Sequence, residues 1–144
     1  MASDTESVAE QPGPTKEPRT TGHRGKVTTD AAQAAAATVY QVAVFTGDIP
    51  SAGTDGDVWL WVDGTAGRSG WRFLDNAADN FERGQTDYFY LDLPDLGALT
   101  AAWIYFRPGG SAPDWFLNTV VVHGKTFSYY NWLQSEGLYT LTPT

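Results

Sequence analysis

Apolar and polar side chains alternate with a period of two over most of the chain beyond residue 37. In the first such stretch Tyr40, Val42 and Val44 occupy one face, and Gln41 and Ala43 occupy the other. Successive side chains of a β-strand point to opposite sides, so this period predicts a strand with one buried face. The same pattern, interrupted by segments rich in Gly, Pro and Asp, predicts further strands at residues 58–62, 71–74, 88–91, 102–107, 115–123, 125–130 and 132–140.

Beyond the alanine run at residues 31–37, no stretch has the period of an amphipathic helix. Short strands at roughly ten-residue spacing, with turn signals between them, are typical of an all-β sandwich of antiparallel strands. The alternation also divides the side chains between two faces. We expect the face opposite the core to carry exposed aromatic rings, namely Trp59, Trp61, Tyr88, Tyr90, Trp103 and Tyr105.

The first 37 residues differ in composition from the rest. All 20 aromatic residues lie between Tyr40 and Tyr139, whereas residues 1–30 are rich in Pro, Glu, Thr and Gly. A segment that cannot bury apolar surface does not offset the entropy lost on ordering. We therefore interpret residues 1–37 as a disordered tail or linker, in which the alanine run could form a helical turn or two. Residues 38–144 form the predicted domain.

The predicted domain is acidic. It carries −7 of the formal net charge of −8, because residues 1–37 hold four basic and five acidic side chains. Such a domain repels the phosphates of nucleic acids and of anionic lipids. We therefore expect no nucleic-acid partner, and we expect that approach to a membrane surface needs a bridging cation.

Several classes of protein are excluded by what the sequence lacks. The absence of cysteine excludes a disulfide framework and thiolate metal ligands. No apolar run is long enough to form a transmembrane segment, and no basic-then-apolar signal follows Met1. We expect a soluble chain without a visible export address, which leaves a secreted and a cytoplasmic location both open.

One acidic stretch stands apart from the alternating pattern. Within eight residues it contains five oxygen-bearing side chains at irregular spacing: Asp75, Asn76, Asp79, Asn80 and Glu82. Calcium takes about six to eight oxygen ligands from carboxylates, amides, backbone carbonyls and water, and a bent loop can direct several of these inward. The stretch therefore predicts either a calcium site or a solvated acidic turn.

Six segments, in order, resemble the PLAT domain, the polycystin–lipoxygenase–alpha-toxin family. They are YQVAVFTG at residues 40–47, AGTDGDV at 52–58, FERG at 81–84 followed by Asp87, LG at 96–97, DWFL at 114–117 and NWL at 131–133. The resemblance implies an eight-stranded antiparallel β-sandwich of two four-stranded sheets. It also implies a non-catalytic module for membrane or protein association, often with calcium in loops at one end.

By the same resemblance, carbonyl oxygens of the A-G-T-D loop would join side chains of the acidic stretch around the ion. The implied ligands are Gly53 and Thr54 through their carbonyls, and Asp75, Asp79 and Glu82 through their carboxylates, with Asn76 or Asn80 completing the shell. We expect Gly53 to adopt a positive φ, Phe81 to attach the acidic loop to the core, and Gly84 to let the chain leave that loop.

The sequence contains no signature of catalysis. It has no Gly-x-Ser-x-Gly, no His-Glu-x-x-His and no phosphate-binding loop. His123 follows a run of valines and is expected at the surface of a strand end. Asp75 and Glu82 could serve as the paired carboxylates of a glycosidase, but no sugar-binding cleft is evident around them. We therefore expect a binding module and not an enzyme.

Two binding roles are open. The first is calcium-assisted association with a lipid membrane, in which Trp71 or the Ile49–Pro50 tip inserts shallowly into the interface. The second is a protein-interaction or self-association module that uses the aromatic face, with calcium only structural or absent. Stacking of carbohydrate on the same rings is a third and weaker interpretation.

Overall fold

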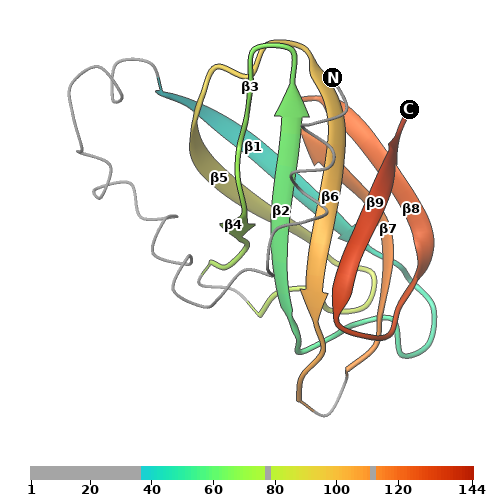
Figure 1. Cartoon of the computed structure of the whole chain (residues 1–144). Helices are drawn as coiled ribbons and strands as arrows, with labels where there is room; N and C mark the ends of the chain where they lie inside the picture. The colour runs from blue at the N-terminus through green and yellow to red at the C-terminus, as the bar shows by residue number, and fades with distance from the viewer. Residues whose placement is uncertain (1–36, 77–78, 111–112) are drawn as a thin grey trace.

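The computed structural model describes residues 37–76, 79–110 and 113–144, which form an all-β domain (Figure 1). Residues 1–36, which hold nearly all of the predicted tail, lie outside the described residues. The strands are β1 (Ala37–Thr46), β2 (Asp57–Gly64), β3 (Gly67–Arg68), β4 (Arg72–Phe73), β5 (Thr86–Pro94), β6 (Leu99–Arg107), β7 (Trp115–Val122), β8 (Lys125–Leu133) and β9 (Gly137–Pro143). The described residues contain no helix, so none that could cross a membrane.

The strands form two facing layers that are joined along one side (Figure 1). All pairings are antiparallel, and the strand order is β3-β2-β6-β9-β8-β7-β1-β5, with β4 also paired to β2. Strand β9 belongs to both layers, because its first part pairs with β6 and its end pairs with β8. The predicted antiparallel sandwich is confirmed. One layer has the four strands β5, β1, β7 and β8, and the other has β2, β6 and β9 with the two-residue strands β3 and β4.

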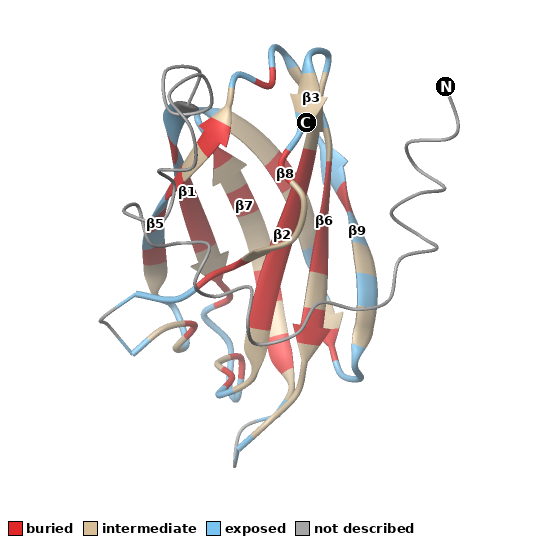
Figure 2. Ribbon diagram, turned by 60° about the vertical axis from the view of Figure 1, so that its left-hand side comes forward, coloured by how far each residue is buried: buried red, intermediate tan, exposed pale blue. Residues whose placement is uncertain are grey.

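The core lies between the layers and follows the predicted alternation. In β2 and β6 the inward positions include Leu60 and Ile104, and in β1 and β5 they include Val44 and Phe89. Figure 2 shows the buried stretches running along the strands of both layers. Burying one side chain of this size contributes about 1.5–3 kcal/mol, so the alternation accounts for the pairing of the two layers.

The final hairpin differs from the prediction. The sequence predicts a break near Asn131, but β8 continues to Leu133 and β9 begins only at Gly137. The pairing with β7 shifts between Leu117 and Thr119, and Tyr130 adopts a φ of 51°. This bulge places an extra residue in one strand without ending it. The break that the sequence predicts near Asn131 is therefore a bulge and not a turn.

The outer face of β2 and β6 corrects the prediction of exposed rings. Trp59, Trp61 and Trp103 are only 0%, 3% and 5% exposed. Strand β4 places Phe73 beside Trp59, with ring centroids 5.0 Å apart, and Trp71 packs edge-on against Trp61 at 5.4 Å. The prediction that these three rings are exposed is wrong, because the alternation identifies the face opposite the core but not the segment that packs against it.

The other predicted outer rings divide into two groups. Tyr105 and Trp71 are partly buried and contact each other, with ring centroids 5.9 Å apart. Tyr88 and Tyr90, on the outer face of β5, are 48% and 52% exposed. An exposed aromatic surface is therefore present on β5, at the edge of the other layer, and not on β2 and β6.

Candidate functional site

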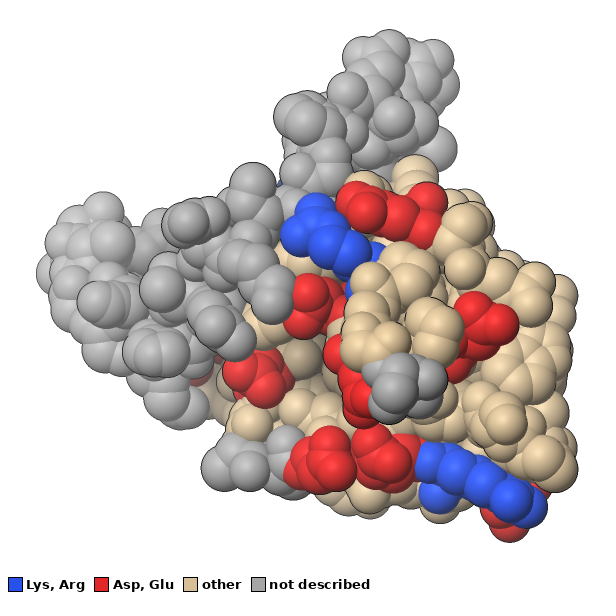
Figure 3. Space-filling model, turned by 90° about the horizontal axis from the view of Figure 1, so that it is seen from below, with Lys and Arg blue, Asp and Glu red and all other residues tan. Residues whose placement is uncertain are grey.

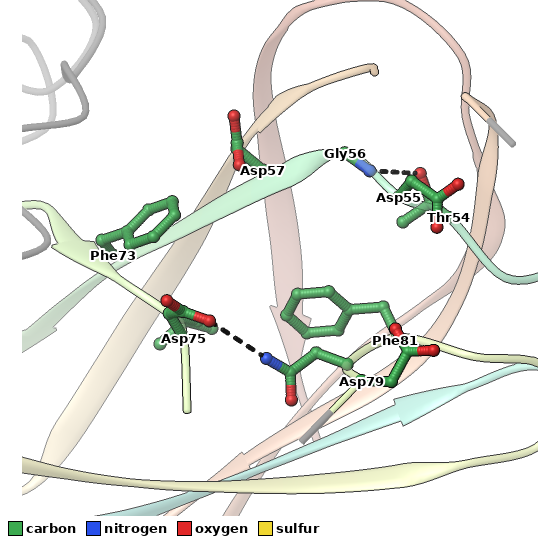
Figure 4. Close-up of a pocket in the computed structure, with 10 residues that line it drawn as sticks. Thr54, Asp55, Gly56, Asp57, Phe73, Asp75, Asp79 and Phe81 are labelled. Carbon is green, nitrogen blue, oxygen red and sulfur yellow. Dashed lines mark hydrogen bonds between the residues drawn. The ribbon is translucent and has the colours of Figure 1, made fainter. Parts of the chain in front are cut away.

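Acidic side chains gather at one end of the sandwich, where the β1–β2, β4–β5 and β6–β7 connections meet (Figure 3). Between the first two connections lies a cavity of about 240 Å³. Its lining comes from both connections, from β4 and from the first residue of β2, and consists of Thr54, Asp55, Gly56, Asp57, Phe73, Leu74, Asp75, Asp79, Asn80 and Phe81 (Figure 4). Four carboxylates thus border a single polar cavity.

The two loops are held together through their backbones. Thr54 N donates a hydrogen bond to the Phe81 carbonyl oxygen at 3.0 Å. A Cβ placed on Gly53 would stand 2.9 Å from Arg83 N and 3.0 Å from the Phe81 oxygen. The prediction of a positive φ at Gly53 is wrong, since the positive-φ glycines among the described residues do not include it. Glycine is required here because the loops approach too closely for a side chain.

Phe81 attaches the acidic loop to the core, as predicted. Its side chain is buried, and its ring packs against Phe89 and Trp115 at centroid distances of 5.9 and 5.2 Å. Gly84 has a φ of 69°, which confirms its predicted role in the exit from the loop. Its N–H donates to the Gly47 carbonyl oxygen at 2.9 Å, which adds a second connection between the loops.

Asn80 lines the cavity and has an unsatisfied side-chain oxygen. Its Nδ2 donates to Asp75 Oδ1 at 3.5 Å, drawn as a dashed line in Figure 4. Its Oδ1 is buried and has no hydrogen-bond partner among the described residues. A buried acceptor left without a donor costs about 1–3 kcal/mol. A bound cation would supply the partner that this oxygen lacks.

The charges around the acidic loop also favour a bound cation. Partial burial raises the pKa of Glu82, and the negative charges of Asp79 and Asp55 raise it further. These carboxylates come from both loops, so their repulsion opposes the approach that the backbone hydrogen bonds impose. A bound cation would remove this repulsion.

The predicted ligands are only partly brought together. Thr54, Asp75, Asp79 and Asn80 line the cavity, and Gly53 lies beside it against the acidic loop. Glu82 is outside the lining, although it lies near enough for the charges of Asp79 and Asp55 to raise its pKa. The Asn76 amide donates to the Tyr88 carbonyl oxygen at 2.8 Å and so faces β5.

Sequence reasoning missed Asp55 and Asp57, which line the cavity opposite the acidic loop. The A-G-T-D loop is expected from the sequence only as a source of backbone carbonyls. The two aspartates follow Thr54 on either side of Gly56. This position was a usable signal, because Thr54 was already expected to contribute its carbonyl. Considering the A-G-T-D-G-D segment as a source of side-chain ligands would have found them.

The donor set fits calcium in chemistry. Carboxylates, an amide oxygen and backbone carbonyls are the ligands that calcium prefers, and calcium tolerates irregular geometry. Within residues 37–76, 79–110 and 113–144, however, no three His, Asp or Glu side chains converge closely enough to form a ready-made metal-binding group. These residues therefore offer an oxygen-rich cavity whose carboxylates would have to draw together around an ion.

The comparison with protein families identifies the domain. The model of the PLAT/LH2 domain matches residues 40–143. The chain belongs to the PLAT/LH2 domain family. The match extends from β1 to β9, so it covers both layers and the loops that form the cavity.

Individual relatives are long proteins of which this PLAT domain spans a small part. It is 45% identical over 83 residues to human lipoxygenase homology domain-containing protein 1, covering 58% of this chain and 4% of that protein. It is 33% identical over 92 residues to the allene oxide synthase-lipoxygenase protein of Plexaura homomalla, covering 61% of this chain and 9% of that protein.

A solved structure with the same fold is that of coral 8R-lipoxygenase, which is described as activated by calcium via a C2-like domain. The likeness has a TM-score of 0.66 at 28% identity, and covers 74% of this chain and 17% of that one. The chain is thus similar to a small portion of a larger enzyme, in keeping with a PLAT domain.

Proposed function

We propose that this PLAT domain is a non-catalytic module that binds calcium in the cavity between its β1–β2 and β4–β5 loops and thereby associates with lipid membranes. The observation that carries the proposal is the cavity itself. It is bordered by Asp55, Asp57, Asp75 and Asp79, and Asn80, which also lines it, has a buried side-chain oxygen without a donor. No hydrogen bond within the described part of the chain accounts for that oxygen.

The calcium would be held by residues of both loops. Asp75, Asp79 and Asn80 would contribute from the acidic loop, and Asp55 with the carbonyls of Gly53 and Thr54 would contribute from the other. Bound calcium supplies positive charge that neutralises these carboxylates and can accept oxygens of a lipid phosphate. The relationship to coral 8R-lipoxygenase, described as calcium-activated via a C2-like domain, supports this choice of ion.

The membrane contact would be made at the same end. Ile49 and Pro50 are exposed on the β1–β2 loop, and the ion pair of Asp48 with Arg83 at 3.0 Å ties that loop to the acidic one. Trp71 is less suited to insertion, because its ring is partly buried against Trp61 and Tyr105. We therefore place the lipid contact at Ile49 and Pro50 rather than at Trp71.

Two measurements test the proposal. Calorimetric titration of calcium into the chelator-treated full chain should show binding, and Asp79→Asn should weaken it strongly. Vesicles of phosphatidylcholine with phosphatidylserine should then pellet the protein with calcium and not with chelator. Glu136→Gln is the matched control, because it removes one charge at a residue outside the cavity that pairs with Arg107, where β6 enters the β6–β7 connection. No calcium binding by the wild-type chain would refute the proposal.

A second role is favoured by one observation. Tyr88 and Tyr90 are about half exposed and lie side by side on β5, which is an edge strand. Aromatic side chains are enriched at protein interfaces, so a protein partner or a second copy of the chain could bind there. Replacing both tyrosines by serine should then reduce association measured by analytical ultracentrifugation, with calcium binding unchanged.

A further inference from the structure

The buried carboxylate of Asp87 has no role in packing that explains its position. Asp87 begins the inward-facing series of β5 that continues through Phe89 and Leu91, and it is almost completely buried. Burying a carboxylate costs free energy unless hydrogen bonds compensate it. An apolar residue at this place would extend the core, so the carboxylate must serve the groups that it contacts.

Those groups all belong to the acidic loop. Asp87 Oδ2 accepts a hydrogen bond from Phe81 N at 2.8 Å, and Asp87 Oδ1 accepts one from Gln85 Nε2. The same Gln85 Nε2 donates to the Asp79 carbonyl oxygen at 2.8 Å. Asp87 is thus linked to the backbone at Phe81 directly and at Asp79 through Gln85.

Phe81 is held in a conformation that its own backbone disfavours. Its φ of 63° lies in the left-handed region, which costs a residue with a bulky side chain of order 1–3 kcal/mol. Three contacts hold it there. Its N–H donates to Asp87 Oδ2, its carbonyl oxygen accepts from Thr54 N, and its ring packs against Trp115 in the core. Since Asn80 and Glu82 flank Phe81, this conformation determines where their side chains point.

We propose that Asp87 is a positioning residue for the cation site: through Phe81 and Gln85 it holds the acidic loop in the shape that presents Asp79 and Asn80 to the cavity. This inference rests on the proposed calcium binding and names a residue that does not itself contact the ion. Removing an outer-shell partner of a metal ligand typically lowers metal affinity about 10- to 100-fold. We expect a loss in that range for variants of Asp87.

Two variants separate position from charge. Asp87→Glu keeps the charge and moves the carboxylate by one methylene, whereas Asp87→Asn keeps the shape and removes the charge. A positioning role predicts that both lower the calcium affinity of the full chain, measured calorimetrically. If Asp87 acts through its charge alone, only Asp87→Asn should lower the calcium affinity. That effect should shrink at 1 M salt, where the Debye length falls to about 3 Å.

Amide hydrogen exchange provides a second readout that does not need calcium. In the calcium-free protein the Phe81 N–H should be protected in the wild type and should exchange faster in both variants, with core amides such as that of Ile104 unchanged. Should the Asp87 variants not fold, Gln85→Ala removes the link to Asp79 from a partly exposed position and should also weaken calcium binding.

The outcomes distinguish this inference from the proposed function. If the wild type binds calcium and all three variants bind it within about twofold of the wild type, Asp87 is not a positioning residue and the calcium site stands. If the wild type does not bind calcium, the proposed function fails, and the inference fails with it. Faster Phe81 exchange together with weaker binding by Asp87→Glu would establish the positioning role.

Discussion

Thr54 donates its backbone N–H to the carbonyl oxygen of Phe81 at 3.0 Å, and this bond joins the two loops that border the acidic cavity. It brings the aspartates that follow Thr54 toward those that precede Phe81. The fold must therefore hold together two acidic segments that repel each other. The spacing of these loops, more than the identity of any one carboxylate, decides whether a cation can be held.

Gly53→Ala should push the two loops apart. The new Cβ would meet the backbone at Arg83 N and at the Phe81 oxygen, both within about 3 Å, and backbone cannot turn aside as a flexible side chain can. Overpacking of this kind costs about 1–3 kcal/mol. We expect a lower melting temperature and weaker calcium binding, measured by calorimetry.

Gly137→Ala is the matched control for this change. It adds the same methyl group at the start of β9, where the Cβ would have no neighbour within 4 Å and φ is not positive. It should leave both the melting temperature and the calcium affinity close to those of the wild type. Equal behaviour of the two variants would show that the close approach at Gly53 is unimportant.

Trp59→Ser should destabilise the fold and not merely alter its surface. The ring is fully buried, packs against Phe73 at 5.0 Å, and carries the Arg107 guanidinium 4.9 Å from its centroid. Truncation of a buried aromatic residue typically costs about 3–5 kcal/mol. Urea unfolding should show a loss of this size, whereas Tyr90→Ser, at an exposed ring of β5, should stay within about 0.5 kcal/mol of the wild type.

The sequence predicted the core and the acidic loop from signals that are local in the chain. Period-two alternation places Val44, Leu60 and Phe89 on the core face, because one side of each strand must be apolar. It could not show that Trp71 and Phe73 pack on the opposite face, because that depends on which strand β4 joins. For the same reason Asp55 is absent from the predicted ligands, since its place opposite Asp79 arises only when the loops meet.

Calcium should raise the melting temperature of the chelator-treated protein. A ligand that binds only the folded state stabilises it by about 2.7 kcal/mol at a concentration of 100 times Kd. Magnesium should stabilise less, because it requires a small, rigid octahedral shell that two irregular loops do not provide. Differential scanning calorimetry with each ion at equal concentration measures the difference. A melting temperature that does not respond to millimolar calcium would rule out the site.

Glu82→Gln should stabilise the calcium-free protein at neutral pH. Partial burial, followed by the charges of Asp79 and Asp55, raises the pKa of Glu82 above its ordinary value of 4.5. The folded state then keeps the proton at pH values where the unfolded chain has lost it, so the ionised side chain destabilises the fold. This destabilisation is absent below about pH 4.5, grows as the pH rises toward the raised pKa, and is complete above it.

Glu136→Gln should have the opposite effect and serves as the control. The hydrogen bond from the Tyr105 hydroxyl lowers the pKa of Glu136, and Arg107 lowers it further against a partial offset from burial. Ionised Glu136 therefore stabilises the fold above its ordinary value of 4.5, and this contribution is lost as the pH falls through the lowered pKa. Melting curves of both variants in chelator between pH 4 and 8 should diverge from the wild type in opposite directions as the pH rises. Saturating calcium should then reduce the stability advantage of Glu82→Gln over the wild type, because the cation neutralises the repulsion that the substitution relieves. If Glu82→Gln gives no stabilisation at pH 8 in chelator, the carboxylates of the two loops are not crowded, and the electrostatic argument for a cation between them is lost.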